Sequence, residues 1–149
     1  MKRIAYIQAA WHSSITDACK DAFLAGLAER GVPADAVRFF SVPGSLEIPL
    51  MAKRLARTGR YAAVCASGLV VDGGIYRHDF VGHAVLQGIV RASLETDVPV
   101  LSAVLTPHHF HDHAVHEDFL RAHLRTKGHE LAEACLAMID GLDAAEALA

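Results

Sequence analysis

The sequence predicts an α/β fold, namely a three-layer α/β/α sandwich with a four-stranded parallel sheet. Short apolar runs alternate with longer amphipathic ones along the chain, which is the pattern of strands joined by crossover helices. The third short run, residues 62–71, is almost wholly apolar, as a strand covered on both faces should be. A length of 149 residues fits one domain, so we expect residues 1–149 to form a single unit.

Two strand–helix units are expected in the first part of the chain. A strand over residues 3–8 precedes an amphipathic helix that begins near Ser13, whose hydroxyl can cap it, and that ends at a glycine. A second strand over residues 37–42 leads into a helix over residues 45–58. Pro49 falls in the first turn of this helix, where a missing N–H group costs little.

Two further units complete the predicted sheet. After the third strand, a turn that contains paired glycines leads into a helix over residues 79–96. Residues 100–105 form the fourth strand and residues 118–141 the last helix, whereas residues 143–149 are weak enough to fray. Right-handed crossovers place the carboxyl ends of all strands at one edge, and flavodoxin-like sheets bind their ligands there.

The composition favours self-association and excludes several functions. The chain is 52% hydrophobic, whereas a domain of this size buries roughly 70% of the surface of its unfolded chain; surplus apolar side chains then favour subunit interfaces, with a larger core as the alternative. A net charge of −3 gives no basic footprint for nucleic acid. No apolar run approaches the ~18 residues of a membrane helix. Three cysteines among small apolar residues favour reduced thiols in a cytoplasmic protein.

Two segments at the predicted ligand edge carry side chains that core packing does not require. Trp11 follows the first strand, and its indole could stack on a planar heterocycle or simply plug the rim of the core. After the second strand, Gly44 permits close backbone approach, and the start of the next helix offers unpaired N–H groups. Glu47 in that first turn could accept hydrogen bonds from a polyol, or it could only complement the helix dipole.

The segments after the third and fourth strands suggest an anion site and, more weakly, a metal site. Paired glycines at residues 73–74 allow successive N–H groups to point at one anion, and Arg77 adds a fixed positive charge. His109 and His113 have the spacing of zinc ligands on a helix. Five histidines within residues 108–116 nevertheless compete without a fixed spacing, so a solvated loop is the alternative, and we predict no metal.

Taken in order, these segments resemble the 6,7-dimethyl-8-ribityllumazine synthase family. The most specific matches are residues 42–49, 72–74 and 79–81, and residues 99–106 and 127–128 also match. The resemblance covers nearly the whole chain and is greatest to a histidine-rich branch of the family, the type II branch, which forms decamers from two face-to-face pentamers. It implies homo-oligomers whose active sites lie between adjacent subunits of a pentamer.

The resemblance also implies roles for individual residues. Trp11 matches the aromatic side chain that stacks on a pyrimidine, and residues 45–47 match the segment that binds a ribityl chain. Residues 69–71 match a strand end whose backbone meets the substrate, and residues 74–75 match the N–H groups that bind phosphate. Ser102 matches a residue that reaches the pyrimidine from the neighbouring subunit. The implied substrate-binding set is Trp11, Ser45, Leu46, Glu47, Leu69, Val70, Val71, Gly74, Ile75, Ser102 and His116.

At two positions the chain departs from the family. The family commonly has its catalytic histidine where this chain has Arg77, and His78 follows one residue later. An arginine stays protonated near neutral pH, so it can hold a phosphate but cannot transfer protons. We therefore assign Arg77 and His78 jointly to catalysis, although adjacent helical residues point about 100° apart. His116 falls about where the family has an arginine that grips the phosphate.

The implied reaction needs no metal or cofactor. An amine of 5-amino-6-(D-ribitylamino)uracil attacks the ketone of 3,4-dihydroxy-2-butanone 4-phosphate, and the lumazine forms as phosphate and water leave. One rival hypothesis is a low-activity or non-catalytic paralogue that binds a lumazine or flavin. Another is a metal-dependent hydrolase built on the histidine cluster, which activity unchanged by a chelator would exclude.

Overall fold

The computed structural model describes residues 3–71, 77–107 and 114–149. One sheet of four parallel strands runs through the described part of the chain, in the order β2-β1-β3-β4. Its strands are β1 (Arg3–Ala9), β2 (Val37–Val42), β3 (Tyr61–Leu69) and β4 (Val100–Leu105). The order is that of the first strands of a flavodoxin-like sheet, so the predicted fold class is confirmed.

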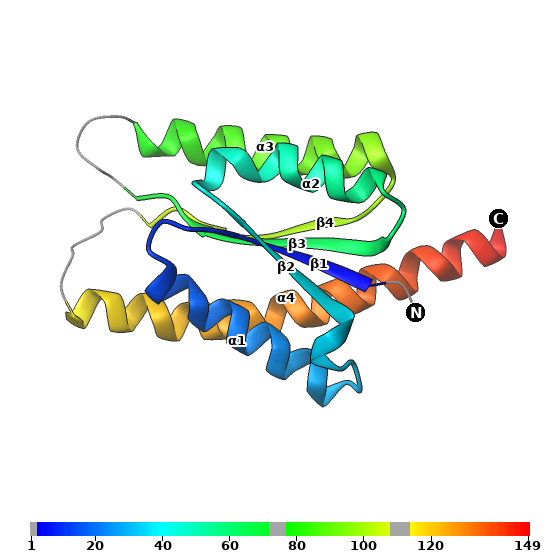
Figure 1. The fold of residues 1–149 in the computed structure, drawn as a ribbon, viewed down its shortest axis with the longest axis horizontal. Coiled ribbons are helices and arrows are strands. Elements are labelled where there is room, and N and C mark those ends of the chain that lie inside the picture. The colour runs from blue at the N-terminus through cyan, green and yellow to red at the C-terminus, as the bar shows by residue number, and fades with distance from the viewer. Residues whose placement is uncertain (1–2, 72–76, 108–113) are drawn as a thin grey trace.

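Helices cover both faces of the sheet. They are α1 (Ser13–Glu29), α2 (Ile48–Arg57), α3 (His78–Thr96) and α4 (Ala114–Leu148), with short 3₁₀ turns at Ala34–Ala36 and Ser45–Glu47. Helices α1 and α4 lie on one face and helices α2 and α3 on the other (Figure 1). All of these α-helices begin at the same end of the sheet, which is the end where the strands finish.

Helix α1 begins at Ser13 as predicted, but one predicted helix cap and several other helix boundaries were wrong. The hydroxyl of Ser13 does not cap α1; His12 occupies the position before the helix, and no side-chain hydrogen bond caps it. The predicted helix over residues 45–58 starts as a 3₁₀ turn, and regular α-helix begins only at Ile48. Helix α4 is longer than predicted at both ends. At its C-terminal end, the alanine-rich last residues favour helix over fraying.

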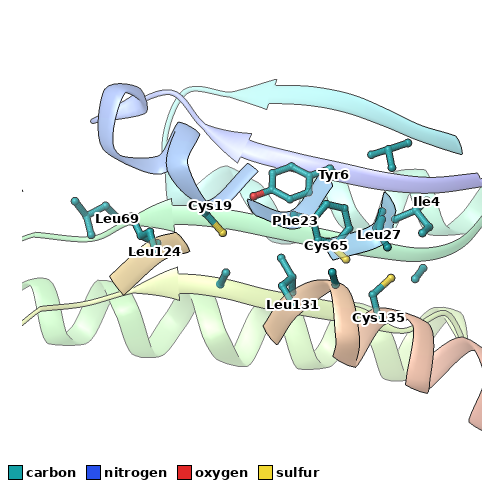
Figure 2. Packing of buried hydrophobic residues seen from close by; sticks show 14 of the residues in the cluster. Ile4, Tyr6, Cys19, Phe23, Leu27, Cys65, Leu69, Leu124, Leu131 and Cys135 are labelled. Atoms are coloured by element: carbon teal, nitrogen blue, oxygen red, sulfur yellow. The ribbon is translucent and has the colours of Figure 1, made fainter. Parts of the chain in front are cut away.

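The α1–α4 side of the sheet holds a core of interlocking aromatic and sulfur-containing side chains (Figure 2). The rings of Tyr6 and Phe23 are fully buried, with centroids 5.0 Å apart. Cys19, Cys65 and Cys135 are free and buried, as predicted. Burial raises the pKa of the Cys19 and Cys65 thiols, which keeps them protonated and unreactive.

Helices α1 and α4 also cross at a glycine. A Cβ atom on Gly128 would lie 2.4 Å from the carbonyl oxygen of Cys19 and 2.7 Å from Cβ of Ala22. Only a residue without a side chain therefore allows the two backbones to approach this closely.

None of the helices in the described ranges is long and apolar enough to cross a membrane. The cytoplasmic location inferred from the cysteines stays a prediction.

Candidate functional site

A cavity of about 380 Å³ lies at the edge of the sheet where the strands end. Two connections, one strand end and one helix supply its walls: the β1–α1 turn, the β2–α2 segment, the end of β3 and the first turn of α3. The residues that line it are Trp11, Pro43, Gly44, Ser45, Leu46, Glu47, Leu69, Val70 and Val81. Segments far apart in sequence thus meet at the edge predicted for ligand binding.

The 3₁₀ turn before α2 fixes the polar part of the cavity. The N–H of Gly44 donates to Oε2 of Glu47 at 3.1 Å, and the N–H of Glu47 donates back to the Gly44 carbonyl at 3.2 Å. The carboxylate is therefore held against the backbone, as in a capping box. A carboxylate fixed by one oxygen keeps acceptor positions for a ligand hydroxyl.

The side chain of Ser45 is packed into a gap that β3 leaves open. Only 8% of this residue is exposed, and a Cβ atom on Gly68 would lie 2.6 Å from its Oγ atom. The glycine in β3 thereby makes room for the hydroxyl at the cavity wall. Any side chain at position 68 would push the serine toward the ligand space.

Two large apolar side chains at the cavity are open to solvent. Trp11 is 64% exposed and Leu46 is 58% exposed. The N–H of Ala10 donates to the carbonyl of Val42 at 2.8 Å, which joins the end of β1 to the end of β2 just before the tryptophan. An exposed indole at a cavity wall offers a flat face for stacking.

Arg77 precedes α3 and is paired with the helix it precedes. Its Nε and Nη2 atoms donate to the two carboxylate oxygens of Asp79 at 3.3 and 3.1 Å, and its guanidinium lies 4.4 Å from the centroid of the Phe80 ring. The hydrogen bond from Arg77 lowers the pKa of the Asp79 carboxyl. Helix α3 begins at His78, and the backbone of Arg77 before it is extended, so the helix period does not set the direction of Arg77 relative to His78.

The other predicted site residues lie away from this cavity or outside the described ranges. Val71 is buried just beyond β3. Ser102 lies within β4, paired in register with Ala66, and its Oγ accepts a hydrogen bond from the N–H of Val104 at 3.1 Å.

Neither catalytic candidate, Arg77 or His78, lines the cavity. His116 lies in α4, which covers the face of the sheet opposite α3. Gly74 and Ile75 fall outside the described residues.

The histidine cluster is described only in part. Residues 108–113 fall outside the described ranges, and within those ranges no three histidine, cysteine, aspartate or glutamate side chains gather as a metal site would require.

Three cavity residues were not predicted as site residues. Pro43 and Gly44 belong to the segment that the sequence singled out, so their place at the strand edge was available as a signal. Val81 is a half-buried apolar residue in the first turn of α3. It falls in the matched range 79–81, but its apolar pattern alone does not separate it from core.

Comparison with known proteins agrees with this geometry. The family model for 6,7-dimethyl-8-ribityllumazine synthase matches residues 1–143. A 6,7-dimethyl-8-ribityllumazine synthase of Rhodococcus erythropolis is 57% identical over 96% of this chain and 92% of its own length. A 6,7-dimethyl-8-ribityllumazine synthase 2 of Pseudomonas syringae is 48% identical over 90% of this chain and 79% of its own.

Among solved structures, a flavodoxin from the domain Archaea covers 89% of this chain and 98% of its own, at 12% identity and a TM-score of 0.36. That score is too low to add to the topology described above. The family match and the identities to curated relatives are sufficient by themselves: the chain belongs to the 6,7-dimethyl-8-ribityllumazine synthase family.

Proposed function

We propose that this chain, acting as one domain, is a cofactor-independent transferase of riboflavin biosynthesis. It condenses 5-amino-6-(D-ribitylamino)uracil with 3,4-dihydroxy-2-butanone 4-phosphate to give 6,7-dimethyl-8-ribityllumazine. The observation that carries the proposal is the cavity at the sheet edge, which combines an exposed indole, a held carboxylate and a serine hydroxyl within apolar walls. That combination suits a planar heterocycle with a polyol tail. The family membership supports the same reaction.

The pyrimidine substrate takes the described cavity. The indole of Trp11 stacks on its ring, and the backbones of Leu69 and Val70 meet its edge. Glu47 keeps one oxygen on the Gly44 N–H and accepts from the ribityl hydroxyls with its other lone pairs, while Ser45 binds the same chain.

The sugar phosphate binds beyond the described wall, beside the start of α3. Gly74 and Ile75, which fall outside the described residues, would donate N–H groups to the phosphate. The side chain of Arg77 is 69% exposed, so an anion can reach its guanidinium beside Asp79. In this scheme, His116 and Ser102 contribute to substrate binding across the boundary between subunits.

The chemistry depends on holding two reactants together. The substrate amine attacks the ketone, water leaves as the imine forms, phosphate is eliminated, and ring closure releases further water. Orientation of two bound reactants can supply about 7–11 kcal/mol of the barrier. Stacking, backbone donors and one anion site supply that orientation without a metal.

The decisive experiment mixes the purified protein with both substrates and follows the lumazine product. The wild type should form product, and Trp11→Ala should raise KM for the pyrimidine about twofold to tenfold, the range expected when one aromatic stacking contact is lost. Absence of product from the folded wild type would contradict the proposal.

Two variants distinguish the residue that transfers protons from the residue that binds the phosphate. His78→Ala should lower kcat by about 10²- to 10⁴-fold if the imidazole transfers protons. Arg77→Ala should chiefly raise KM for the sugar phosphate. Full activity in Arg77→Ala would remove Arg77 from the mechanism, and full activity in His78→Ala would remove His78.

One observation favours a second candidate function, a low-activity or non-catalytic protein that binds a lumazine or flavin. Where the family commonly has a histidine, this chain has Arg77, and both carboxylate oxygens of Asp79 accept from its guanidinium. A yellow, fluorescent ligand that copurifies with the protein, together with no turnover of the two substrates, would favour this alternative.

The assembly we propose is a homo-oligomer built from pentamers, a decamer in the manner of the type II branch. Large apolar side chains of α2 and α3 support self-association, because Leu50, Leu86, Val90 and Leu94 are exposed in the single chain. Ten chains of 16.0 kDa give about 160 kDa, which sedimentation distinguishes from a pentamer or a shell.

A further inference from the structure

The turn that carries Trp11 contains a backbone conformation that needs explanation. His12, directly after the tryptophan, has φ 58° and ψ 37°, which is the left-handed region. Among the described residues other than glycine, only His12 and Asp97 have a positive φ. Non-glycine residues keep this conformation only where the surrounding structure imposes it, and such positions cluster at functional sites.

Contacts on the α1 side hold this conformation in place. The carbonyl of His12 accepts from the N–H groups of Ile15 and Thr16 at 2.9 and 3.1 Å, and both of these residues are buried. The hydroxyl of Thr16 also donates to the same carbonyl at 3.4 Å. The first turn of α1 is therefore closed onto His12, although no side chain caps it.

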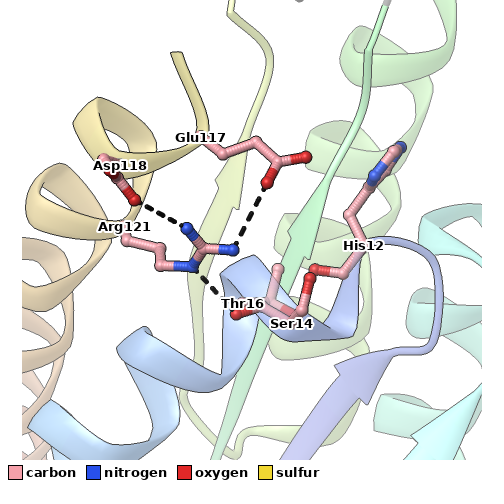
Figure 3. A network of polar contacts seen from close by, with 6 residues as sticks. All are labelled: His12, Ser14, Thr16, Glu117, Asp118 and Arg121. Carbon is pink, nitrogen blue, oxygen red and sulfur yellow. Dashed lines mark hydrogen bonds and ion pairs between the residues drawn. The ribbon is translucent and has the colours of Figure 1, made fainter. Parts of the chain in front are cut away.

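A second helix anchors the same turn from outside. The Nε atom of Arg121 in α4 donates to the carbonyl of Ser14 at 3.3 Å (Figure 3). Its two terminal nitrogens contact Glu117 at 3.4 Å and Asp118 at 2.9 Å, so the guanidinium is held in that position. On the strand side, the Ala10 N–H is bound to Val42. The chain is thus fixed on both sides of residues 11 and 12.

We propose that His12 is a positioning residue for substrate binding, acting through its left-handed backbone to hold the Trp11 indole at the cavity wall. A right-handed backbone conformation at position 12 would redirect the chain just before α1 and turn the indole away from the cavity. The role in substrate binding rests on the proposed function, because it is there that Trp11 stacks on the pyrimidine. The placement of the indole does not, and it is measured without substrate.

The test uses backbone preference as the variable. His12→Gly and His12→Asn retain access to the left-handed region, whereas His12→Ala disfavours it and β-branched His12→Val disfavours it more. Trp11 is the only tryptophan in the chain, so its emission maximum and its quenching by acrylamide report the position of the indole directly. Both are measured on the full assembly without substrate, alongside KM for the pyrimidine and a thermal melt.

Asp97→Val is the matched control. Asp97 has the same φ of 58°, but it ends α3 and does not line the cavity. The control should lose thermal stability to a degree similar to His12→Val, yet leave tryptophan emission and KM as in the wild type. A merely structural role for His12 predicts the same pattern for both valine variants.

We expect His12→Val, and His12→Ala to a smaller extent, to change emission and quenching and to raise KM for the pyrimidine about fivefold to tenfold. His12→Gly and His12→Asn should restore wild-type emission and KM. Unchanged emission in the folded alanine variant would overturn the proposal. A tenfold rise in KM in His12→Gly with wild-type emission would also overturn it, because the imidazole itself would then contribute to binding. If the emission pattern holds but no variant or wild type forms product, the proposed function fails and the positioning role of His12 stands.

Discussion

The two faces of the sheet are completed in different ways. On one face, α1 and α4 cross so closely that Gly128 meets the backbone of Cys19, and the side chains between them and the sheet are buried. On the other face, α2 and α3 cover the sheet but leave large apolar side chains outside, with Leu50 63% and Leu94 76% exposed. The α1–α4 side, which we call the closed face, also exposes some large apolar side chains of α4, such as Phe119 at 68%. The α2–α3 side, which we call the open face, exposes more of them, and the cavity lies beside it.

This difference explains where the exposed apolar surface lies. Large apolar side chains on the surface of a soluble chain mark interaction sites when they gather on one face. Leu46 and Trp11 extend the apolar surface of α2 and α3 to the cavity. A second copy of the chain that covers this face would also border the ligand, which is consistent with the proposed active site between subunits.

The largest effect should come from removing core on the closed face. Leu124 in α4 is fully buried, so Leu124→Ala should lower the free energy of unfolding by about 2–5 kcal/mol. Leu148→Ala, on the same helix at 89% exposure, should change it by less than about 0.5 kcal/mol. Urea unfolding at one protein concentration measures both. Equal effects of the two variants would show that α4 does not depend on this core.

The next largest effect on stability should come from the glycine where α1 and α4 cross, and the same substitution elsewhere on α4 should have the opposite sign. In Gly128→Ala the new Cβ meets backbone that cannot move aside, so overpacking should destabilise by about 1–3 kcal/mol despite a helix-propensity gain of about 1 kcal/mol. Gly141 lies on the same helix, and a Cβ atom at this position would have no neighbouring atom within 4 Å, so Gly141→Ala should stabilise the fold. Thermal melts of the two variants should therefore shift in opposite directions; a shared direction would contradict the close crossing.

Charge on the open face should change assembly more than folding. The double variant Val90→Asp and Leu94→Asp replaces two exposed apolar side chains of α3 and should weaken association at least about tenfold. Circular dichroism should still show the wild-type helix content. Sedimentation across a dilution series measures the change, with Leu148→Asp as a control that adds one such carboxylate at the end of α4. Unaltered assembly in the double variant would place the interface elsewhere.

The sheet was the easier part to predict from sequence. Apolar runs and their alternation with amphipathic segments located each strand of the described ranges, and the bounds of β2 and β4 were predicted without error. Helix starts were less predictable, because they depend on the backbone before the helix. Nothing in the sequence shows that His12 is left-handed or that Ser45 opens a 3₁₀ turn.

The site was predictable where it follows from topology. Trp11, residues 45–47 and residues 69–70 meet because each follows a strand at the same edge. Ser102 does not join them, since its implied role is to reach the site of a neighbouring subunit, and one chain's order of strands says nothing about neighbours. Val81 was missed because an apolar residue in a first helical turn has the same pattern whether it faces core or cavity.

The smallest effect concerns ion pairs that join the helices on each face. On the open face, Glu95 of α3 binds Lys53 of α2 at 2.8 Å and Arg91 at 2.6 Å, and these contacts, chiefly the one with Lys53, lower the pKa of Glu95 from 4.5 to about 2. A folded-state pKa below the unfolded value means stability that is present above pH 4.5 and lost as the pH falls toward 2. The advantage of the wild type over Glu95→Gln should therefore be small at neutral pH, because solvent reaches both side chains, which are 31% and 32% exposed, and should disappear over that window.

Two companion variants sharpen the contrast between the faces. Lys53→Met should raise the pKa of Glu95, because the largest cause of its lowered pKa is removed, and stability should then be lost at higher pH. On the closed face, Glu133 lies 3.8 Å from Arg30 with its side chain 70% exposed, so Glu133→Gln should change stability little at any pH. Urea unfolding between pH 2 and pH 7 compares the three variants. A wild-type advantage over Glu95→Gln that persisted to pH 2 would show that packing, not charge, joins α2 to α3 at this point.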